Sequence, residues 1–506
     1  CISDLSDSDL ERILWISNNF IQNSILSESE KFTWSFVGGQ DFFLRDTLLF
    51  ELNLESLILS NQFHEIVINN VNGFFDLRKN KFFAKSGFVD GERFGFNPIK
   101  IKVNLGEFEL DLSTSSIEVA NAVLQNNVYF NAESKGHFSD YLSRVPRQGD
   151  FPKFQSYTDD LKINFFNGFS CVGAVDIKKN IFFLKRFNKP LNFFISNEYV
   201  KGVFYSDVLK IKDSSFSSNN VNTSFFFNNG DSIFHPNMKF RYDDLEKNIY
   251  LRKYDFSYLS YKPILNSFHG LNIYSDFLRV NLKNSTAAFV HYPSKVEQKV
   301  LFESVDYYDD QRFLDLNIDE KNNLLAILIK FSNDLDLKNS ISIGTFSEEL
   351  NLNNSQVINI LKTLEIFDFV SVDSYLNEFD IKKKAFTFYE SRQRKYDFDS
   401  FQIESSCFLN DTVSQINFKN YKMDIFNVLG VKITNQHEYD IDLKNKNISF
   451  FDDRSFNMNA NLRFGNFLFS SKNIEFNYDE FCFYFPDESS CNIFDLKSSK
   501  KNKFIQ

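Results

Sequence analysis

Four short segments of this 506-residue chain share one pattern, and that pattern limits what the chain can fold into. Each segment begins with Asp and an aliphatic residue, continues through a polar turn that ends in Lys-Asn, and finishes with apolar residues. The segments are 76–83, 176–183, 244–250 and, with one extra residue, 442–448. A polar turn between two apolar runs is typical of a strand that reverses into a second strand. The pattern predicts repeated antiparallel strand-turn units in a solenoid, jelly-roll or sandwich-like arrangement.

The four segments do not form a regular repeat. Their starts, at residues 76, 176, 244 and 442, are unevenly spaced. Residues 336–340 approximate the same pattern although they lie between predicted helices, so part of it reflects a chain rich in Lys and Asn. We therefore interpret the segments as hairpin-like reversals on both sides of a helical region. This arrangement favours a scaffold or binding surface over a single catalytic pocket.

Composition also predicts a mainly β protein. The chain contains 64 Phe and 21 Tyr against 3 Met and 2 Trp. Aromatic and β-branched residues favour strands, whereas Asn, Asp and Ser favour turns. Only 8 Pro and 17 Gly are present, so many turns must use Asn or Asp at positive φ.

Hydrophobic periodicity suggests four regions. Residues 1–30 hold an N-terminal helix, because apolar residues recur every three or four positions between 5 and 27. Residues 31–315 form a β-rich domain with a candidate seam at the loop 144–152. Residues 316–395 form an inserted winged-helix-like α+β module, and residues 396–506 form a second β-rich domain with a charged tail.

The winged-helix prediction rests on the order of the elements in 316–395. A helix is expected at 323–331, followed by one that Thr345 caps, with Glu348 closing a capping box. Asn353 or Asn354 then caps a helix that ends near Ile366. Two strands follow, at 369–372 and 381–388.

Nucleic acid is not an expected partner. The last of the three helices exposes one base, Lys362, and one acid, Glu365, whereas helices that read DNA usually bring several basic side chains. The predicted wing adds Lys382, Lys383 and Lys384, but the net charge of the chain is −11. A module for packing or partner docking is the interpretation we favour.

Two features of the cysteines leave alternatives open. Cys1 could be the lipidated first residue of a mature bacterial lipoprotein, or simply the start of a fragment. Cys482 and Cys491 could form a disulfide across a hairpin in an oxidising compartment, or remain buried free thiols. The five cysteines show no zinc-binding spacing, and no apolar run reaches the ~18 residues that span a bilayer.

No catalytic residue, cofactor site or metal site is predicted. The six histidines are scattered, and the common nucleophile, phosphate-loop and dinucleotide motifs are missing from the sequence. Asp306, Asp309 and Asp310 could belong to a carboxylate-dependent hydrolase or a calcium site. A solvated turn on an acidic surface is the interpretation we favour for them.

Alternating Phe-rich strands leave one further alternative open. Such strands could form an open apolar groove for lipid acyl chains or glycans, as in the jelly rolls of lipopolysaccharide transport. The same rings could instead fill the core of a sandwich or solenoid, which is the commoner use of Phe.

Several longer segments resemble one known family. They are Gly-Asp-Ser-Ile-Phe-His-Pro at 230–236, Asn-Ser-Phe-His-Gly-Leu-Asn-Ile-Tyr at 266–274, Phe-Glu-Ser-Val-Asp-Tyr-Tyr at 302–308 with Gln-Arg-Phe at 311–313, and Phe-Pro-Lys-Phe-Gln-Ser-Tyr at 151–157. Together they are similar to very large, uncharacterised cell-envelope proteins of Bacteroidota, over most of 34–490. The family brings no known catalytic residues.

The resemblance implies a location in the bacterial envelope: periplasm, outer membrane or cell surface. The expected function is a non-enzymatic structural or interaction scaffold within a larger assembly. Its expected partners are other envelope proteins, with lipid or glycan as the alternative.

Overall fold

The computed structural model describes residues 7–39, 43–46, 49–97, 101–126, 132–142, 150–166, 168–212, 214–255, 257–290, 298–318, 322–334, 340–373, 377–395, 400–407, 412–433 and 439–493. Contacts between residues divide the chain into two compact units. Unit 1 comprises Cys1–Ile195 and Tyr205–Ser218, and unit 2 comprises Ser196–Phe204 and Asn219–Gln506. Most of the predicted seam at 144–152 lies outside the described residues.

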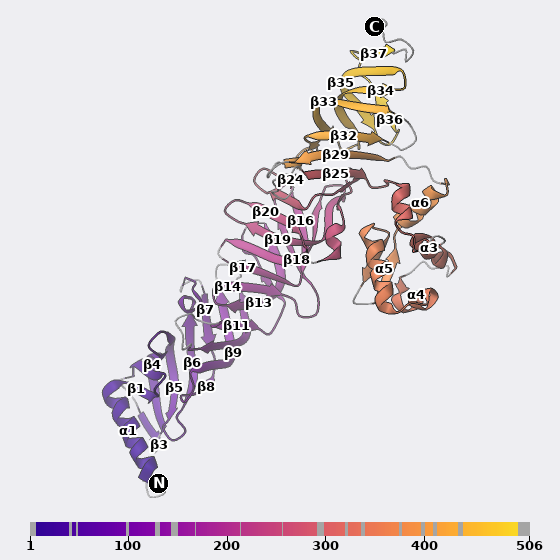
Figure 1. Ribbon diagram of the computed structural model, residues 1–506. Coiled ribbons are helices and arrows are strands. Elements are labelled where there is room, and N and C mark those ends of the chain that lie inside the picture. Colours follow the sequence, from indigo (N-terminus) through magenta and orange to yellow (C-terminus); the bar gives the residue numbers. More distant parts are fainter. Residues whose placement is uncertain are drawn as a thin grey trace. The chain divides into compact units, whose positions relative to one another are not determined.

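The prediction of a mainly β fold is confirmed, and the strands pair antiparallel in both units (Figure 1). The strands up to residue 226 are β1 (Ile25–Glu28), β2 (Thr33–Gly38), β3 (Phe43–Asp46), β4 (Leu49–Ser60), β5 (Glu65–Asp76), β6 (Lys81–Asp90), β7 (Ile101–Leu105), β8 (Phe108–Asp111), β9 (Ser116–Asn126), β10 (Ala132–Tyr141), β11 (Lys153–Ser156), β12 (Leu161–Ile163), β13 (Phe169–Lys178), β14 (Ile181–Lys185), β15 (Leu191–Ser196), β16 (Lys201–Ser206), β17 (Val208–Lys212) and β18 (Ser215–Phe226).

The remaining strands belong to unit 2. They are β19 (Ser232–Asp243), β20 (Asn248–Lys253), β21 (Ile264–Asn266), β22 (Leu271–Ile273), β23 (Phe277–Asn281), β24 (Thr286–Val290), β25 (Gln298–Ser304), β26 (Ile341–Ser342), β27 (Val370–Asp373), β28 (Glu378–Ile381), β29 (Phe401–Cys407), β30 (Thr412–Asn417), β31 (Met423–Ile425), β32 (Val428–Ile433), β33 (Tyr439–Phe450), β34 (Phe456–Phe464), β35 (Phe467–Asn477), β36 (Cys482–Tyr484) and β37 (Ser490–Ile493).

The helices are fewer and short. They are α1 (Asp7–Asn23), α2 (Asp310–Leu314), α3 (Leu324–Asp334), α4 (Ile343–Leu350), α5 (Asn354–Ile366) and α6 (Lys383–Arg392), with 3-10 turns η2 (Gly91–Phe94) and η3 (Tyr258–Tyr261).

A long strand that pairs with two different short strands recurs in both units. In unit 1, β6 pairs with β8 and then β7, and β13 pairs with β15 and then β14. In unit 2, β19 pairs with β21 and then β20, and β35 pairs with β37 and then β36. Each long strand therefore contributes to two walls of a folded sheet.

The long strands change partner at residues that suit a local bend. In β19 the change falls at Pro236 and Asn237, between the segment paired with β21 and the one paired with β20. In β35 it falls at Asn473, whose φ is 60°, where the register with β34 also shifts. A bulge of this kind bends a strand and resets which side chains face inward.

The Lys-Asn segments are used in two ways. Three of them are hairpin turns as predicted, between β5 and β6, β13 and β14, and β19 and β20. The prediction is wrong for the fourth, 442–448, which lies inside the continuous strand β33. There Lys446 has φ of 51° and the register with β34 shifts, so the segment forms a bulge. Residues 335–339 lie outside the described residues.

Several turns of the sheet stack on one another. In the hairpins 76–81, 243–248 and 281–286 the fifth residue has a positive φ. Its carbonyl accepts a backbone hydrogen bond from the following turn: Leu112 N–H to Asn80 O, Leu282 N–H to Lys247 O, and Phe418 N–H to Ser285 O. Each of these turns thus has a carbonyl group that is hydrogen-bonded to the next turn, so the backbone pairing continues from one hairpin to the next.

The space between the walls is filled with aromatic and aliphatic side chains. The largest fully buried ones are Trp34, Tyr242, Phe75, Phe82, Phe94, Phe138, Phe154, Phe193, Phe204, Phe225, Phe289 and Phe302. Each belongs to the inward face of its element, as the alternating burial along the strands shows.

The N-terminal helix ends earlier than the predicted span 5–27, because β1 begins at Ile25. It runs from Asp7 to Asn23 and packs through Phe20, whose ring centroid lies 5.1 Å from Phe36 and 5.3 Å from Phe50. Leu14 and Ile21 were predicted on its apolar face, but they are 68% and 69% exposed.

The helical module has the element order of a winged helix: α3, β26, α4, α5, β27 and β28, with β26 and β27 both paired to β28. Asn353 caps α5 in a capping box, as predicted. Two details are wrong. Ser342 rather than Thr345 caps α4, because the helix begins earlier, and most of 381–388 belongs to α6 rather than to a strand.

We predict that Gly136→Ala destabilises unit 1. A Cβ at this β10 position would lie 2.2 Å from the carbonyl oxygen of Gln155 and 2.6 Å from Phe154 Cζ. Overpacking against a paired backbone costs about 1–3 kcal/mol, so thermal unfolding followed by circular dichroism should shift to lower temperature. Gly430→Ala is the matched control, since its Cβ would meet nothing within 4 Å. Equal stability of the two variants would contradict the prediction.

Candidate functional site

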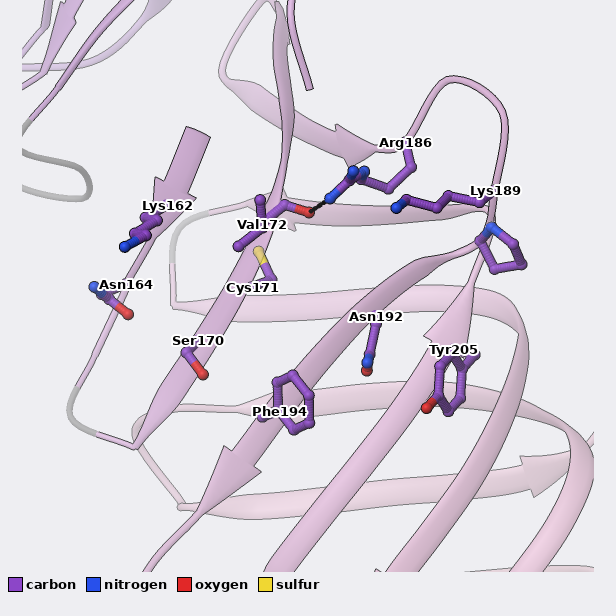
Figure 2. Close-up of a pocket in the computed structure, with 11 residues that line it drawn as sticks. Lys162, Asn164, Ser170, Cys171, Val172, Arg186, Lys189, Asn192, Phe194 and Tyr205 are labelled. Carbon is purple, nitrogen blue, oxygen red and sulfur yellow. Dashed lines mark hydrogen bonds between the residues drawn. The ribbon is translucent and has the colours of Figure 1, made fainter. Parts of the chain in front are cut away.

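An open groove lies on the outward face of unit 1, over β12, β13, β15 and the end of β16, and beside the loop that follows β14 (Figure 2). The register explains how its side chains come together. Lys162 of β12 lies opposite Val172 of β13, and Ser170 of β13 lies opposite Phe194 of β15. Since side chains two positions apart share one face of a strand, Asn192 joins Phe194 on the groove side.

The groove floor is aromatic and amide-bearing. Phe194 and Tyr205 are 39% and 43% exposed, although neighbouring inward rings such as Phe193 are completely buried. Asn192 is drawn between these two rings in Figure 2, and its Oδ1 is buried without a hydrogen-bond partner. The hollow has a volume of about 590 Å³.

The rim is basic and held in place by one carboxylate. The Arg186 Nε lies 2.7 Å from Asp159 Oδ2, and its Nη1 donates to Val172 O. Asp159 also accepts from the backbone N–H of Phe187, and this hydrogen bond, together with Arg186, lowers the pKa of the carboxyl. The loop 186–190 that carries Lys189 is therefore fixed at its start.

Gly173 sets the shape of the groove. It lies where β13 stops pairing with β15 and begins to pair with β14. A Cβ there would lie 2.8 Å from Lys185 O and 3.0 Å from Leu191 Cδ1. Only glycine allows the two short strands to approach this closely, and their connecting loop contributes Arg186, Lys189 and Pro190 to the groove lining.

The chemistry of the lining favours binding over acid–base catalysis. The described residues that line the groove include no Asp, Glu or His. The thiol among them, that of Cys171, is 4% exposed, and burial raises its pKa to about 12. A thiol in this state is protonated and inert at neutral pH.

His235 and His269, which lie in the segments 230–236 and 266–274, are buried in the protein interior. The Nδ1 atom of His269 lies 2.9 Å from Asn266 Nδ2, and its Nε2 atom lies 2.8 Å from the carbonyl oxygen of Tyr421. Burial lowers the pKa of His269 to about 4 and that of His235 to about 3. Both rings are neutral in the folded protein at pH 7.

Buried carboxylates are neutralised by arginine. Asp140 meets Arg93 in a two-point contact at 2.7 and 2.9 Å, and Glu303 meets Arg312 in the same way at 2.6 and 2.9 Å. Burial raises the pKa of Asp140 more than Arg93 lowers it. Such pairs hold elements together and leave no oxygen directed at a substrate.

The aspartates near residue 306 serve the fold. Asp309 caps α2, and Asp310 accepts hydrogen bonds from Tyr308 and Arg392. Among the residues that the structure describes, no group of three or more His, Cys, Asp or Glu could hold a metal ion.

Of the two alternatives for Cys482 and Cys491, the structure has free thiols rather than a disulfide. Cys482 lies opposite Asn477 of β35, whereas Cys491 lies opposite Phe469 of the same strand. Eight residues at about 3.3 Å each separate these positions by roughly 26 Å, and a disulfide needs Cα atoms within about 7 Å. Both thiols are free and half-buried. Cys1 lies outside the described residues.

The face of α5 that a winged helix would turn to DNA contacts the protein itself. Glu365 accepts a hydrogen bond from Tyr258 of η3, and the Lys362 Nζ lies 5.4 Å from the centre of the Tyr258 ring. The three lysines predicted on the wing instead open α6, and Lys382 pairs with Asp368. These contacts favour a packing role for the module.

Sequence reasoning singled out none of the groove residues. The available signal was alternation in Leu191–Ser196, which places Asn192 and Phe194 opposite to the buried Leu191, Phe193 and Ile195. One outward Phe is not informative in a chain with 64 of them.

Comparison with known proteins finds no protein-family model that matches this chain and no curated protein that aligns with it. In the described part of the chain, no helix is both long enough and apolar enough to cross a membrane.

We predict that Cys171 resists alkylation in the folded protein. With its pKa near 12, about one thiol in 10,000 is ionised at pH 8, and the side chain is also enclosed. Iodoacetamide followed by peptide mass spectrometry should label Cys482 and Cys491 long before Cys171, and all three after unfolding in guanidinium. Native labelling of Cys171 at the rate of the other two would show that the groove floor opens.

Stability should fall as the pH drops from 7.5 to 5.5. The folded-state pKa values of His235 and His269 lie below the usual 6.5, so the unfolded chain binds protons first. Relative to pH 7.5, each histidine should lower the free energy of unfolding at pH 5.5 by about 1.4 kcal/mol, which urea titration can measure. The variants His235→Gln and His269→Gln should each reduce the pH dependence. A wild-type stability that stays constant over this range would contradict the assignment.

Proposed function

We propose that this chain is a non-enzymatic interaction scaffold of a bacterial cell envelope, and that the outward groove of unit 1 binds carbohydrate. The observation that carries the proposal is the combination on that face of two exposed aromatic rings, Phe194 and Tyr205, with the amide of Asn192 and the hydroxyl of Ser170. The envelope location rests on the family resemblance of the sequence.

A sugar ring has an apolar C–H face and a rim of hydroxyl groups. Aromatic rings exposed on a sheet offer a flat apolar surface for the first, and amide or hydroxyl side chains offer hydrogen bonds for the second. Because the groove is open along the sheet, an extended chain of sugars could pass through it. The lack of acidic or histidine side chains in the described lining supports binding without turnover.

A lipid conduit between the walls fits the observations less well. An acyl chain would need accessible apolar side chains along the inner face. The inward rings of unit 1, including Phe138, Phe154 and Phe193, are completely buried by their neighbours. Lipid would therefore have to separate packed walls before it could bind.

The proposal is tested by affinity electrophoresis of the full chain in gels that contain soluble polysaccharides, namely dextran, xylan, alginate and polygalacturonate. At least one should retard the protein. Phe194→Ala and Tyr205→Ala should each weaken binding about three- to tenfold, the value of one aromatic contact. Phe63→Ala is the matched control, since this ring is 42% exposed outside the groove. No retardation by any polysaccharide, or retardation that the two groove variants leave unchanged, would refute the proposal.

A further inference from the structure

The rim of the groove has the opposite charge to the rest of the chain. The net charge of the chain is −11, yet the groove is lined by Lys162, Arg186 and Lys189. One carboxylate beside the groove, Asp159, pairs with Arg186, whereas the described lining itself contains these three cations and no carboxylate. A local field of this sign attracts anions to the groove.

Two of the three cations remain available. Lys162 and Lys189 are exposed, and among the described residues neither lies within 4 Å of a carboxylate oxygen, although Lys189 is close enough to Asp159 to help lower the pKa of its carboxyl. In Figure 2 they lie on different sides of the groove, Lys162 on β12 and Lys189 on the loop before β15. One small anion would engage one of them, whereas a ligand with acidic groups at intervals would engage both.

The backbone of the groove floor offers nothing to a peptide. Cys171, in the centre of β13, pairs with Ile163 on one side and Phe193 on the other. A bound peptide needs partners for its own N–H and C=O groups, which usually come from a free sheet edge. Recognition here must come from side chains on the sheet face, which suits hydroxyl-rich rings.

We infer that the groove binds an acidic saccharide, an oligomer whose sugar rings contact Phe194 and Tyr205 and whose anionic groups lie against Lys162 and Lys189. This inference rests on the proposed carbohydrate site and specifies its ligand class. The acidic group is a carboxylate, as in a uronic acid, or a phosphate ester, since both present oxygens that an ammonium group can bind.

The experiment uses matched pairs of probes with the full chain and isothermal titration calorimetry. Oligogalacturonate is compared with its methyl ester, and phosphomannan with the same mannan after phosphatase treatment. At least one acidic probe should bind, its neutral partner should bind at least tenfold more weakly, and the difference should shrink as salt is added. The carboxylate and phosphate arms identify which acidic group is recognised.

Charge variants assign the effect to the groove. The double variant Lys162→Gln with Lys189→Gln should lower affinity for the acidic probe about tenfold and leave the neutral probe unaffected. Lys135→Gln, an exposed lysine of β10 outside the groove, should change neither. Arg186 is left intact because it anchors the loop through Asp159.

The possible failures are distinguishable. Equal binding of acidic and neutral partners, still sensitive to Tyr205→Ala, would overturn the acidic ligand class and preserve the carbohydrate site. Acidic binding that the lysine variants leave unchanged would overturn the inference by placing the charge contact elsewhere. If no probe of either kind binds, the inference is refuted, and the proposed function is decided separately by the polysaccharide gels described above.

Discussion

A long strand can cover both walls of a folded sheet only if its backbone changes direction between its two halves. The rest of this structure depends on how that bend is made. In β19 and β35 it falls at Pro236 with Asn237 and at Asn473, where the partner strand also changes. Because side chains alternate along a strand, an extra residue at each of these bends keeps the apolar side chains of both halves inward. In β13 the partner changes at Gly173 while the alternation continues unbroken. The buried aromatic core follows from these few positions.

The same bends determine what is left for the outer face. One face of a strand packs against the opposite wall. The side chains on its other face are not constrained by this packing, and they contact solvent or a ligand. At Gly173, where β13 changes partner from β15 to β14, the missing side chain lets these two strands approach closely, and their connecting loop adds Arg186, Lys189 and Pro190 to the groove lining. The groove thus results from the strand pairing around Gly173. Packing of the core does not determine which side chains lie on this outer face, so its basic and aromatic residues are not needed for folding.

Local signals in the sequence predicted much of the fold. Alternation predicted the mainly β class, and the turn pattern predicted three hairpins, because both depend on neighbouring residues. The errors arose where distant contacts decide. Residues 442–448 have turn chemistry, yet pairing with β34 keeps them inside β33 as a bulge. Residues 383–388 have strand-like composition, yet packing of Phe388 against Phe369 and Tyr308 favours α6. Ser342 caps α4 because β26 ends there.

The candidate site was beyond local signals for a different reason. Its members come from β12, β13, β15 and β16 and from one loop, so only the strand register brings them together. Each residue alone is ordinary: an outward Phe, an exposed Lys, an Asn in a strand. What distinguishes them is a contrast with their surroundings, exposed rings beside completely buried ones and a positive rim on a chain of net charge −11. A sheet that satisfies its own backbone leaves such side-chain contrasts on its outer face for recognition, and these contrasts are the physical basis of the proposed binding role.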